Sequence, residues 1–233
     1  MNQQAVIIKV FEFAILVFAL SLHEAAHAWM ASRLGDPTAR MLGRLTLNPM
    51  KHIDPFGTIL VPLAMLFLFP GGFIVGWAKP TPVTPRNFKN LRRDDILTTL
   101  AGPVSNLAAA VAATIVLILL ARLSATGAVV VRGLARGGLP DMSAPTLLVP
   151  FAVILYLAVW LNLILAVFNL IPLPPLDGSH VVRHFLPYKA LRLYDSIGII
   201  GLLLFLFLGG QFLAAFVTPM LAFVNSVLLS FAM

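Results

Sequence analysis

Long apolar runs dominate the chain and alternate with short polar segments. The runs cover approximately Ala5–Leu34, Asp95–Leu123, Thr146–Leu170, Leu191–Leu208 and Gln211–Phe231. All except the fourth reach the length of about 20 residues with which an α-helix crosses a bilayer. The pattern predicts an all-α polytopic membrane protein with about five transmembrane helices. Two glycines, Gly209 and Gly210, separate the last two runs and predict a tight helical hairpin there.

Another apolar segment, Phe56–Trp77, is interrupted by prolines and glycines. Its uninterrupted part, Leu63–Phe69, is too short to span a bilayer, so a re-entrant or interfacial piece is expected, although the sequence leaves a crossing open. The preceding stretch, Thr38–Leu47, alternates weakly between apolar and polar residues and predicts a β-hairpin. The chain as a whole predicts one integral membrane domain over residues 1–233, with a core over about 5–187 and a C-terminal helical hairpin over 188–233.

Composition and charge support a membrane protein. Hydrophobic residues make up 60% of the chain and charged residues 11%, which excludes a soluble domain or a disordered chain. The net charge of +7 arises from loop cations, which favour anionic lipid headgroups over nucleic acid as partners. With Phe56–Trp77 re-entrant, 12 cations fall on one side and 3 on the other, which the positive-inside rule interprets as an outside N-terminus. The first run is interpreted as a retained span rather than a signal peptide.

The first apolar run contains the sequence His23-Glu24-Ala25-Ala26-His27, an H-E-x-x-H motif. Cysteine is absent, so a metal ion must be held by His, Asp or Glu. On a helix, His23 and His27 share one face and can bind one metal ion, while Glu24 can accept a proton from water at that metal. Such residues are costly inside a span unless they have partners or a function. The alternative is a buried polar cluster that bridges helices.

A zinc site requires a third protein ligand and an open position. Asp177 is the best candidate, because the prolines between 172 and 175 end the third full span and place it at the depth of His27. An ordinary interfacial turn explains this segment equally well. A rival site would combine Asp177 with His180 and His184, but no Glu lies nearby to act as a base.

Two motifs together resemble the site-2 protease family of intramembrane zinc metalloproteases. They are His23-Glu24-Ala-Ala-His27 and Asn169-x-x-Pro172-x-Pro174-x-Leu176-Asp177-Gly178. Two further segments are similar to the family, Ala101-Gly102-Pro103-Val-Ser-Asn106 and His52-Ile-Asp54-Pro55-Phe56-Gly57. The similarity covers about Leu16 to Leu186. The chain resembles the compact members of the family, which lack a PDZ-like domain and a regulatory nucleotide-binding (CBS) domain.

The resemblance implies one Zn²⁺ per chain, bound by His23, His27 and Asp177, with Glu24 as the catalytic base. It implies a zinc metalloendopeptidase that hydrolyses peptide bonds in or near the transmembrane segments of membrane-anchored proteins or peptides. The expected location is a prokaryotic inner or plasma membrane, with the active site toward the cytoplasm. A three-helix catalytic core would come from the first three full spans, and a re-entrant β-hairpin would lie between Asp36 and Pro85.

The sequence also leaves an alternative function and several further candidate residues open. A non-catalytic zinc-binding scaffold of the same fold is the alternative function; an ion transporter is disfavoured, because the other spans carry almost no charge. Asn169 is a candidate donor to the oxyanion or to substrate backbone, or an ordinary helix C-terminal Asn. Asn106 is a weaker candidate for that chemistry, and a hydrogen bond between helices is favoured. His52 either supports the site or is a solvated loop histidine, and Lys9 with Glu12 predicts an i,i+3 ion pair.

Overall fold

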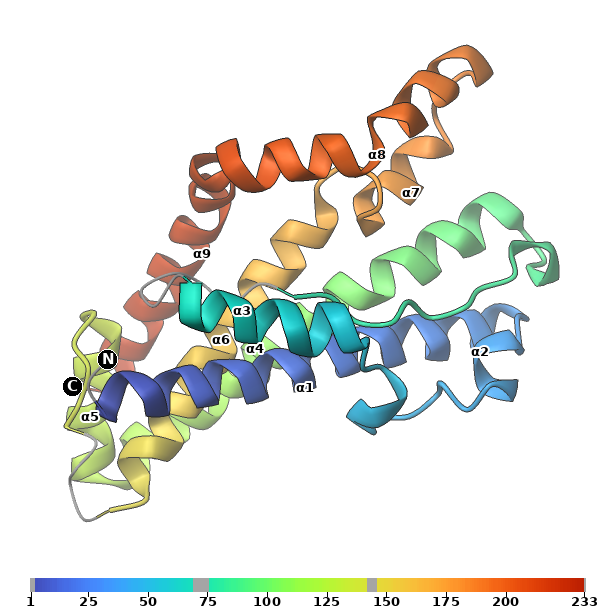
Figure 1. Cartoon of the computed structure of the whole chain (residues 1–233). Helices are drawn as coiled ribbons and strands as arrows, with labels where there is room; N and C mark the ends of the chain where they lie inside the picture. Colours follow the sequence, from blue (N-terminus) through green and yellow to red (C-terminus); the bar gives the residue numbers. More distant parts are fainter. Residues whose placement is uncertain (1–2, 69–75, 142–145, 233) are drawn as a thin grey trace.

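The structure is a computed structural model that describes residues 3–68, 76–141 and 146–232, and it is built from helices (Figure 1). In this part of the chain, four helices are long and apolar enough to cross a membrane. They are α1 (Gln3–Leu34), α4 (Leu91–Leu123), α6 (Leu148–Leu170) and α9 (Gly210–Phe231). These helices confirm the predicted class, an all-α polytopic membrane protein.

The remaining elements connect or flank these four helices. Five are α-helices or short helical turns on the side of the molecule that carries the H-E-x-x-H motif: α2 (Thr38–Met41), η1 (Pro49–Lys51), η2 (Pro55–Leu60), η3 (Pro85–Asn87) and α7 (Asp177–Arg183). Three others are α3 (Val61–Leu68), α5 (Ala125–Ala135) and α8 (Tyr188–Leu208). Figure 1 shows both termini beside α5, at the end of the molecule opposite α2.

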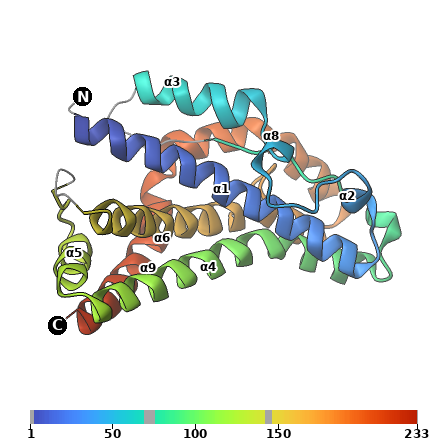
Figure 2. The same cartoon turned by 90° about the horizontal axis from the view of Figure 1, so that it is seen from below.

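Helix α4 packs against α1, α5, α6 and α9 (Figure 2). The larger apolar core lies between α4, α5, α6 and α9 and includes the fully buried Leu117, Val131 and Leu228. A smaller cluster joins Leu16 and neighbouring residues of α1 to Leu165 of α6. Because α1, α4 and α6 also contact one another, the structure has a three-helix core formed by the first three full spans.

Helix α4 begins earlier than its apolar run. The Asn90 side chain accepts the N–H of Arg93 at 3.1 Å, and the Asp94 carboxylate accepts the N–H of Asn90 at 2.9 Å. Such a reciprocal cap satisfies N–H groups that the first helical turn leaves unpaired. It allows the helix to start at Leu91 in polar sequence, four residues before the predicted span.

The apolar segment after His52 folds back on itself. The N–H of Trp77 donates to the carbonyl of Gly57 at 3.1 Å, and the N–H of Lys79 donates to the carbonyl of His52 at 2.8 Å. The hydroxyl of Thr58 also donates to the carbonyl of Trp77 at 2.7 Å. The segment therefore returns to the place where it started, as a re-entrant piece does; residues 69–75 lie outside the described residues.

The predicted β-hairpin is wrong in the part of the chain that the structure describes. Helix α2 occupies Thr38–Met41, and neither residues 36–68 nor residues 76–85 contain a strand. The Asp36 carboxylate accepts both the N–H and the hydroxyl of Thr38, at 3.1 and 2.5 Å, which starts a helical turn instead of an extended strand. Gly43, with a φ of 68°, then reverses the chain.

Helix α8 contains the fourth apolar run, where the sequence predicts an additional span. It is not one of the four candidate membrane spans found among the described residues, and it is kinked at Gly198, which has a φ of 38°. Its first half holds the segment before α7, because the Tyr194 hydroxyl donates to the carbonyl of Pro172 at 2.9 Å. Helix α9 follows directly after Gly209, meets α8 at this turn and packs mainly against α4, α5 and α6.

Candidate metal centre

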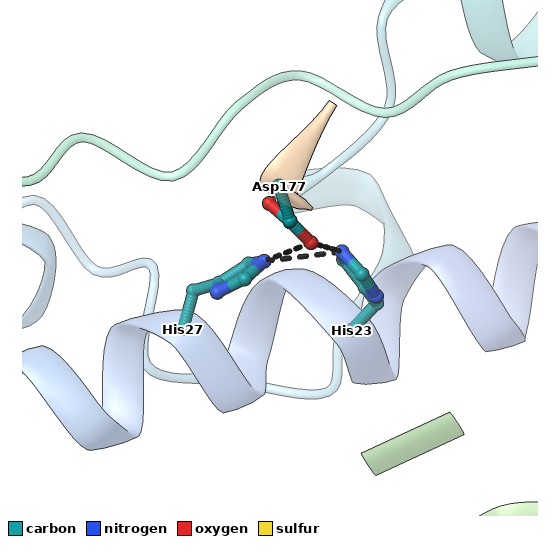
Figure 3. A group of neighbouring side chains, drawn as sticks. All are labelled: His23, His27 and Asp177. Carbon is teal, nitrogen blue, oxygen red and sulfur yellow. Dashed lines mark hydrogen bonds and ion pairs between the residues drawn. The ribbon is translucent and has the colours of Figure 1, made fainter. Parts of the chain in front are cut away.

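The two histidines of the H-E-x-x-H motif lie on one face of α1, as their spacing predicts (Figure 3). Both are buried, with 4% and 8% of the residue exposed for His23 and His27. Their Nε2 atoms lie 3.0 Å apart, and the two rings are almost perpendicular. The helix thus brings two imidazole nitrogens to one point in the interior.

The partners of the Nδ1 atoms determine what the Nε2 atoms can do. His23 Nδ1 lies 2.6 Å from Asn106 Oδ1, and His27 Nδ1 lies 2.8 Å from the carbonyl of Thr98. Both partners are acceptors, so each neutral ring carries its hydrogen on Nδ1 and presents a lone pair on Nε2. Two lone pairs that face each other at 3.0 Å repel, and a shared cation removes that repulsion.

Asn106 is held by a short network of amides that fixes which way its side chain points. Its Nδ2 donates to Asn162 Oδ1 at 2.8 Å and to the carbonyl of Ala19 at 3.3 Å, which leaves Oδ1 facing His23. Asn106 is fully buried and Asn162 is 4% exposed. Sequence reasoning missed Asn162, although an amide in the middle of an apolar span is a signal for an interhelical hydrogen bond.

Gly102 allows α4 to pass close to the two histidines. A Cβ atom at this position would lie 2.5 Å from His23 Cε1 and 2.5 Å from His27 Nε2, well inside van der Waals contact. Any larger residue would therefore displace the rings or the helix. The sequence contains this glycine in a family-like segment, but only the packing of α4 on α1 shows that it borders the metal centre.

Asp177 completes the cluster from the opposite side. It is the first residue of α7, and its Oδ2 lies 3.1 Å from His23 Nε2 and 3.4 Å from His27 Nε2 (Figure 3). The next residue, Gly178, packs so tightly against the end of α6 that a Cβ would lie 2.3 Å from the carbonyl of Leu170. Close packing of the Asp-Gly pair thus holds Asp177 beside the histidines.

Burial of Asp177 would by itself raise the pKa of its carboxyl. Where a proton occupies an imidazole Nε2, the interactions with His23 and His27 outweigh burial and hold the pKa of Asp177 well below its usual range. The carboxyl is therefore ionised. Its Oδ2 is buried and satisfies no hydrogen bond with good geometry, although both imidazoles lie within ion-pair distance. An ionised oxygen in this position is available to a cation.

The three ligand atoms fit a zinc ion. Zinc binds His nitrogen and carboxylate oxygen at about 2.0–2.2 Å in tetrahedral geometry, which separates ligand atoms by roughly 3.3–3.6 Å. The observed separations are 3.0, 3.1 and 3.4 Å. Two neutral imidazoles and one carboxylate also form a donor set that zinc uses in catalytic sites, where a fourth position stays open.

Glu24 lies next to His23 and is half-buried. Its Oε2 accepts the N–H of Thr81 at 2.6 Å, and its backbone carbonyl accepts the Thr81 hydroxyl at 2.9 Å. These contacts come from the extended segment between α3 and η3, which runs alongside α1 past the motif. The sequence points to Glu24 through H-E-x-x-H, but nothing in the sequence identifies Thr81 as its partner.

The other candidate residues lie in different surroundings. Asn169 Nδ2 donates to the carbonyl of Leu165, one turn back on α6, at 2.9 Å. His184 Nε2 pairs with Asp95 Oδ2 at 2.7 Å, and His180 is exposed, so these histidines do not gather around Asp177. Among the described residues, the one group of three or more potential metal ligands is that of His23, His27 and Asp177.

The structure also decides the expectations for His52 and for the pair of Lys9 and Glu12. His52 is 1% exposed and its Nε2 lies 2.8 Å from the carbonyl of Thr46, so it is not a solvated loop histidine. Its backbone carbonyl instead supports the segment that carries Thr81, through Lys79. The predicted ion pair between Lys9 and Glu12 is confirmed at 2.7 Å.

Comparisons with known proteins agree with this donor set. The chain matches the description "Peptidase family M50" over residues 11–209. It is 38% identical to a Bacillus subtilis protein named "Putative zinc metalloprotease YwhC" over 211 residues, which cover 90% of this chain and 81% of that relative. A Mycobacterium tuberculosis protein named "Putative zinc metalloprotease Rip2" is 32% identical over 160 residues, 69% of this chain and 51% of its own length.

A Mycolicibacterium smegmatis protein of the same name is 34% identical over 99 residues, which cover 41% of this chain and 35% of that relative. No solved structure gives a match. The family description covers most of the chain, and the geometry of the His23, His27 and Asp177 side chains suits the metal in the relatives' names. The chain therefore belongs to peptidase family M50, the site-2 protease family, and is a zinc metalloprotease.

Proposed function

We propose that this zinc metalloprotease cleaves peptide bonds inside, or at the edge of, the transmembrane segments of membrane-anchored proteins. The observation that carries the proposal is the convergence of His23 Nε2, His27 Nε2 and Asp177 Oδ2 within a bundle of membrane-spanning helices. The motif begins 20 residues after the start of α1, about 30 Å along a helix that rises 1.5 Å per residue. The centre thus lies within the apolar bundle rather than in a soluble domain.

In this proposal His23, His27 and Asp177 hold one Zn²⁺ per chain. Bound zinc supplies Lewis-acid chemistry: it polarises the scissile carbonyl and lowers the pKa of water toward about 7. The chain's own residues do the rest. Asn106 and the Thr98 carbonyl hold both imidazoles in the tautomer that binds metal through Nε2.

Glu24 acts as the general base. It accepts a proton from the attacking water and donates it to the leaving amine, and such a positioned carboxylate typically contributes about 10²–10⁴-fold. The contact between its Oε2 and Thr81 keeps the carboxylate beside the histidine pair. No direct role in catalysis is assigned to Asn169 or Asn106, because one amide bonds its own helix and the other orients His23.

The substrate must present an unwound backbone. In a transmembrane helix every peptide group is paired within the helix, so a bond can reach the centre only after local unwinding. The loops around the centre carry 12 of the 16 basic residues, whereas Arg122, Arg132 and Arg136 lie near α5 at the opposite end, where Lys9 is paired with Glu12. By the positive-inside rule, this distribution supports an active site on the cytoplasmic side of a prokaryotic plasma membrane.

A cleavage assay in proteoliposomes tests this function. The substrate is a synthetic transmembrane peptide with a fluorophore and a quencher at its two ends, and mass spectrometry locates the cut. The purified wild type should contain about one zinc per chain and cut near the cytoplasmic end of the peptide. Glu24→Gln should keep its zinc and lose at least about 10²-fold in rate.

Three results would contradict parts of this assignment. Unchanged cleavage by Glu24→Gln would remove the general base from the mechanism. Full zinc in Asp177→Asn would move the third ligand elsewhere. A wild type that binds zinc but cuts no transmembrane peptide would favour the alternative function, a zinc-binding membrane scaffold of the same fold.

A further inference from the structure

An extended segment runs alongside α1 past the H-E-x-x-H motif. We call residues 76–84 the strap; it runs from the re-entrant segment toward η3 and contains no helix or strand (Figure 1). Nothing in the metal cluster requires it, because the three candidate ligands come from α1 and α7. Two of its hydrogen bonds nevertheless reach one residue of the motif, Glu24.

Both ends of the strap are attached to buried groups. At its start, the N–H of Lys79 donates to the carbonyl of His52, which is 1% exposed. At its end, the N–H of Thr84 donates to Oδ2 of Asp36 at 2.7 Å, and Asp36 is fully buried directly after α1. The strap is therefore tied down on either side of Thr81.

Between these attachments, Thr81 contacts a single residue of α1 twice. Its N–H donates to Glu24 Oε2 at 2.6 Å, and its hydroxyl donates to the backbone carbonyl of the same residue at 2.9 Å. The hydroxyl fixes the strap on the helix, and the N–H then fixes the carboxylate on the strap. No other side-chain hydrogen bond of Glu24 occurs within the described residues, so Oε1 stays available.

The sequence of the strap suits this role. Thr81 lies between Pro80 and Pro82, which have no N–H group and lock their own φ angles. Proline also pushes the residue before it toward extended backbone, so Pro82 keeps Thr81 extended. Thr81 therefore offers the one N–H of this tripeptide.

We propose that Thr81 is a positioning residue for the general base: its N–H holds the Glu24 carboxylate in the orientation that proton transfer requires. The inference rests on the proposed function of Glu24. A carboxylate on an otherwise free glutamate side chain samples several rotamers, whereas a base must lie within about 2.6–3.2 Å of the proton that it accepts. A displacement of 1 Å can cost about 10²-fold in rate.

Three variants separate the two contacts of Thr81. Thr81→Val keeps the N–H and removes the hydroxyl, while Thr81→Pro removes both; Thr81→Ser keeps both. The matched control is Val83→Pro, which places the same residue in the strap where the replaced N–H makes no hydrogen bond to the described chain. Cleavage of the transmembrane peptide, zinc content and thermal stability are measured for each.

We expect Thr81→Pro to lower kcat by about 10–100-fold with KM and zinc content unchanged, because the base is mispositioned while substrate and metal still bind. Thr81→Val should lose less than about 5-fold, and Thr81→Ser and Val83→Pro should resemble the wild type. A Thr81→Pro variant with wild-type zinc, stability and kcat would overturn the proposal.

Hydrogen–deuterium exchange gives a readout that does not depend on activity. Because Pro80 and Pro82 carry no amide hydrogen, exchange in residues 80–82 reports Thr81 alone. The amide should exchange slowly in the wild type and at least about 10-fold faster in Glu24→Ala. Fast exchange in the wild type, or equal rates in both proteins, would overturn the inference even if Thr81→Pro does not fold. A wild type that cleaves nothing but protects this amide would count against the proposed function, not against the contact.

Discussion

The glycine that borders the histidine pair offers the sharpest test of the metal centre. Replacing Gly102 with alanine adds one methyl group, which would lie 2.5 Å from His23 Cε1 and 2.5 Å from His27 Nε2. Carbon atoms in contact are separated by about 3.5–4.0 Å, so the methyl group and the rings must move apart by about 1 Å. The ring positions are constrained by the Nδ1 partners Asn106 and Thr98.

The magnitude follows from how little a zinc site can move. Metal–ligand distances tolerate only about ±0.2 Å, and overpacking of this kind costs about 1–3 kcal/mol. If that strain is relieved only when the metal leaves, the affinity of Gly102→Ala for zinc falls by about 5- to 150-fold. Competition with a chelator of known affinity measures this on the purified protein, and thermal unfolding with and without zinc provides a second reading.

A second glycine provides the control. Gly133 is also inside a helix, but a Cβ there meets no atom within 4 Å. Both substitutions gain about 0.8–1 kcal/mol of helix propensity, so their difference isolates the contact with the histidines. Zinc affinity of Gly133→Ala should equal that of the wild type. A Gly102→Ala variant that binds zinc as tightly as Gly133→Ala would refute the close packing of α4 against the two histidines.

Three further predictions concern the surroundings of the centre. Asn106→Leu should weaken zinc binding about 10–100-fold, measured by chelator competition, because His23 loses its acceptor; unchanged affinity would contradict that role. Gly178→Ala should reduce zinc content because the new Cβ would lie 2.3 Å from a carbonyl and displace Asp177, and normal zinc content would disprove this. Burial raises the pKa of Asp36, but the hydrogen bonds that it accepts outweigh burial and lower that pKa below its usual value. Asp36 should therefore stabilise the fold above its ordinary pKa of about 3.9, with the effect lost as the pH falls through the lower, folded value, so the thermal stabilities of wild type and Asp36→Asn should converge in acid; a constant difference would refute this.

Much of the site could be predicted because its signals are local. The 3.6-residue period of a helix places His23 and His27 together, and the proline-rich end of the third span points to Asp177 at the same depth. These predictions require only one helix and one break in a helix. The buried amide Asn106 was likewise visible as a polar residue in an apolar span, and the structure places it against His23.

The rest depends on how segments distant in sequence approach one another. Gly102 borders the histidines only because α4 crosses α1 at that point, and Thr81 reaches Glu24 only because the strap returns from the re-entrant segment. The β-hairpin was predicted wrongly from weak alternation over Thr38–Leu47, where Asp36 stabilises a helical turn through side-chain hydrogen bonds. A short alternating pattern without a strong turn signal does not distinguish these outcomes.

The distance in sequence between the two halves of the metal centre has a consequence for biosynthesis. His27 and Asp177 are separated by 150 residues, and α4 and α6 both lie between them. At a synthesis rate of about 5–20 residues per second, the ribosome needs roughly 8–30 s to add this length. During that time the nascent chain carries the histidine pair and the proposed general base Glu24 without the proposed third ligand Asp177. The order of synthesis thus delays completion of the centre until α1, α4 and α6 have all been made, and α9 alone of the four candidate spans is still to follow.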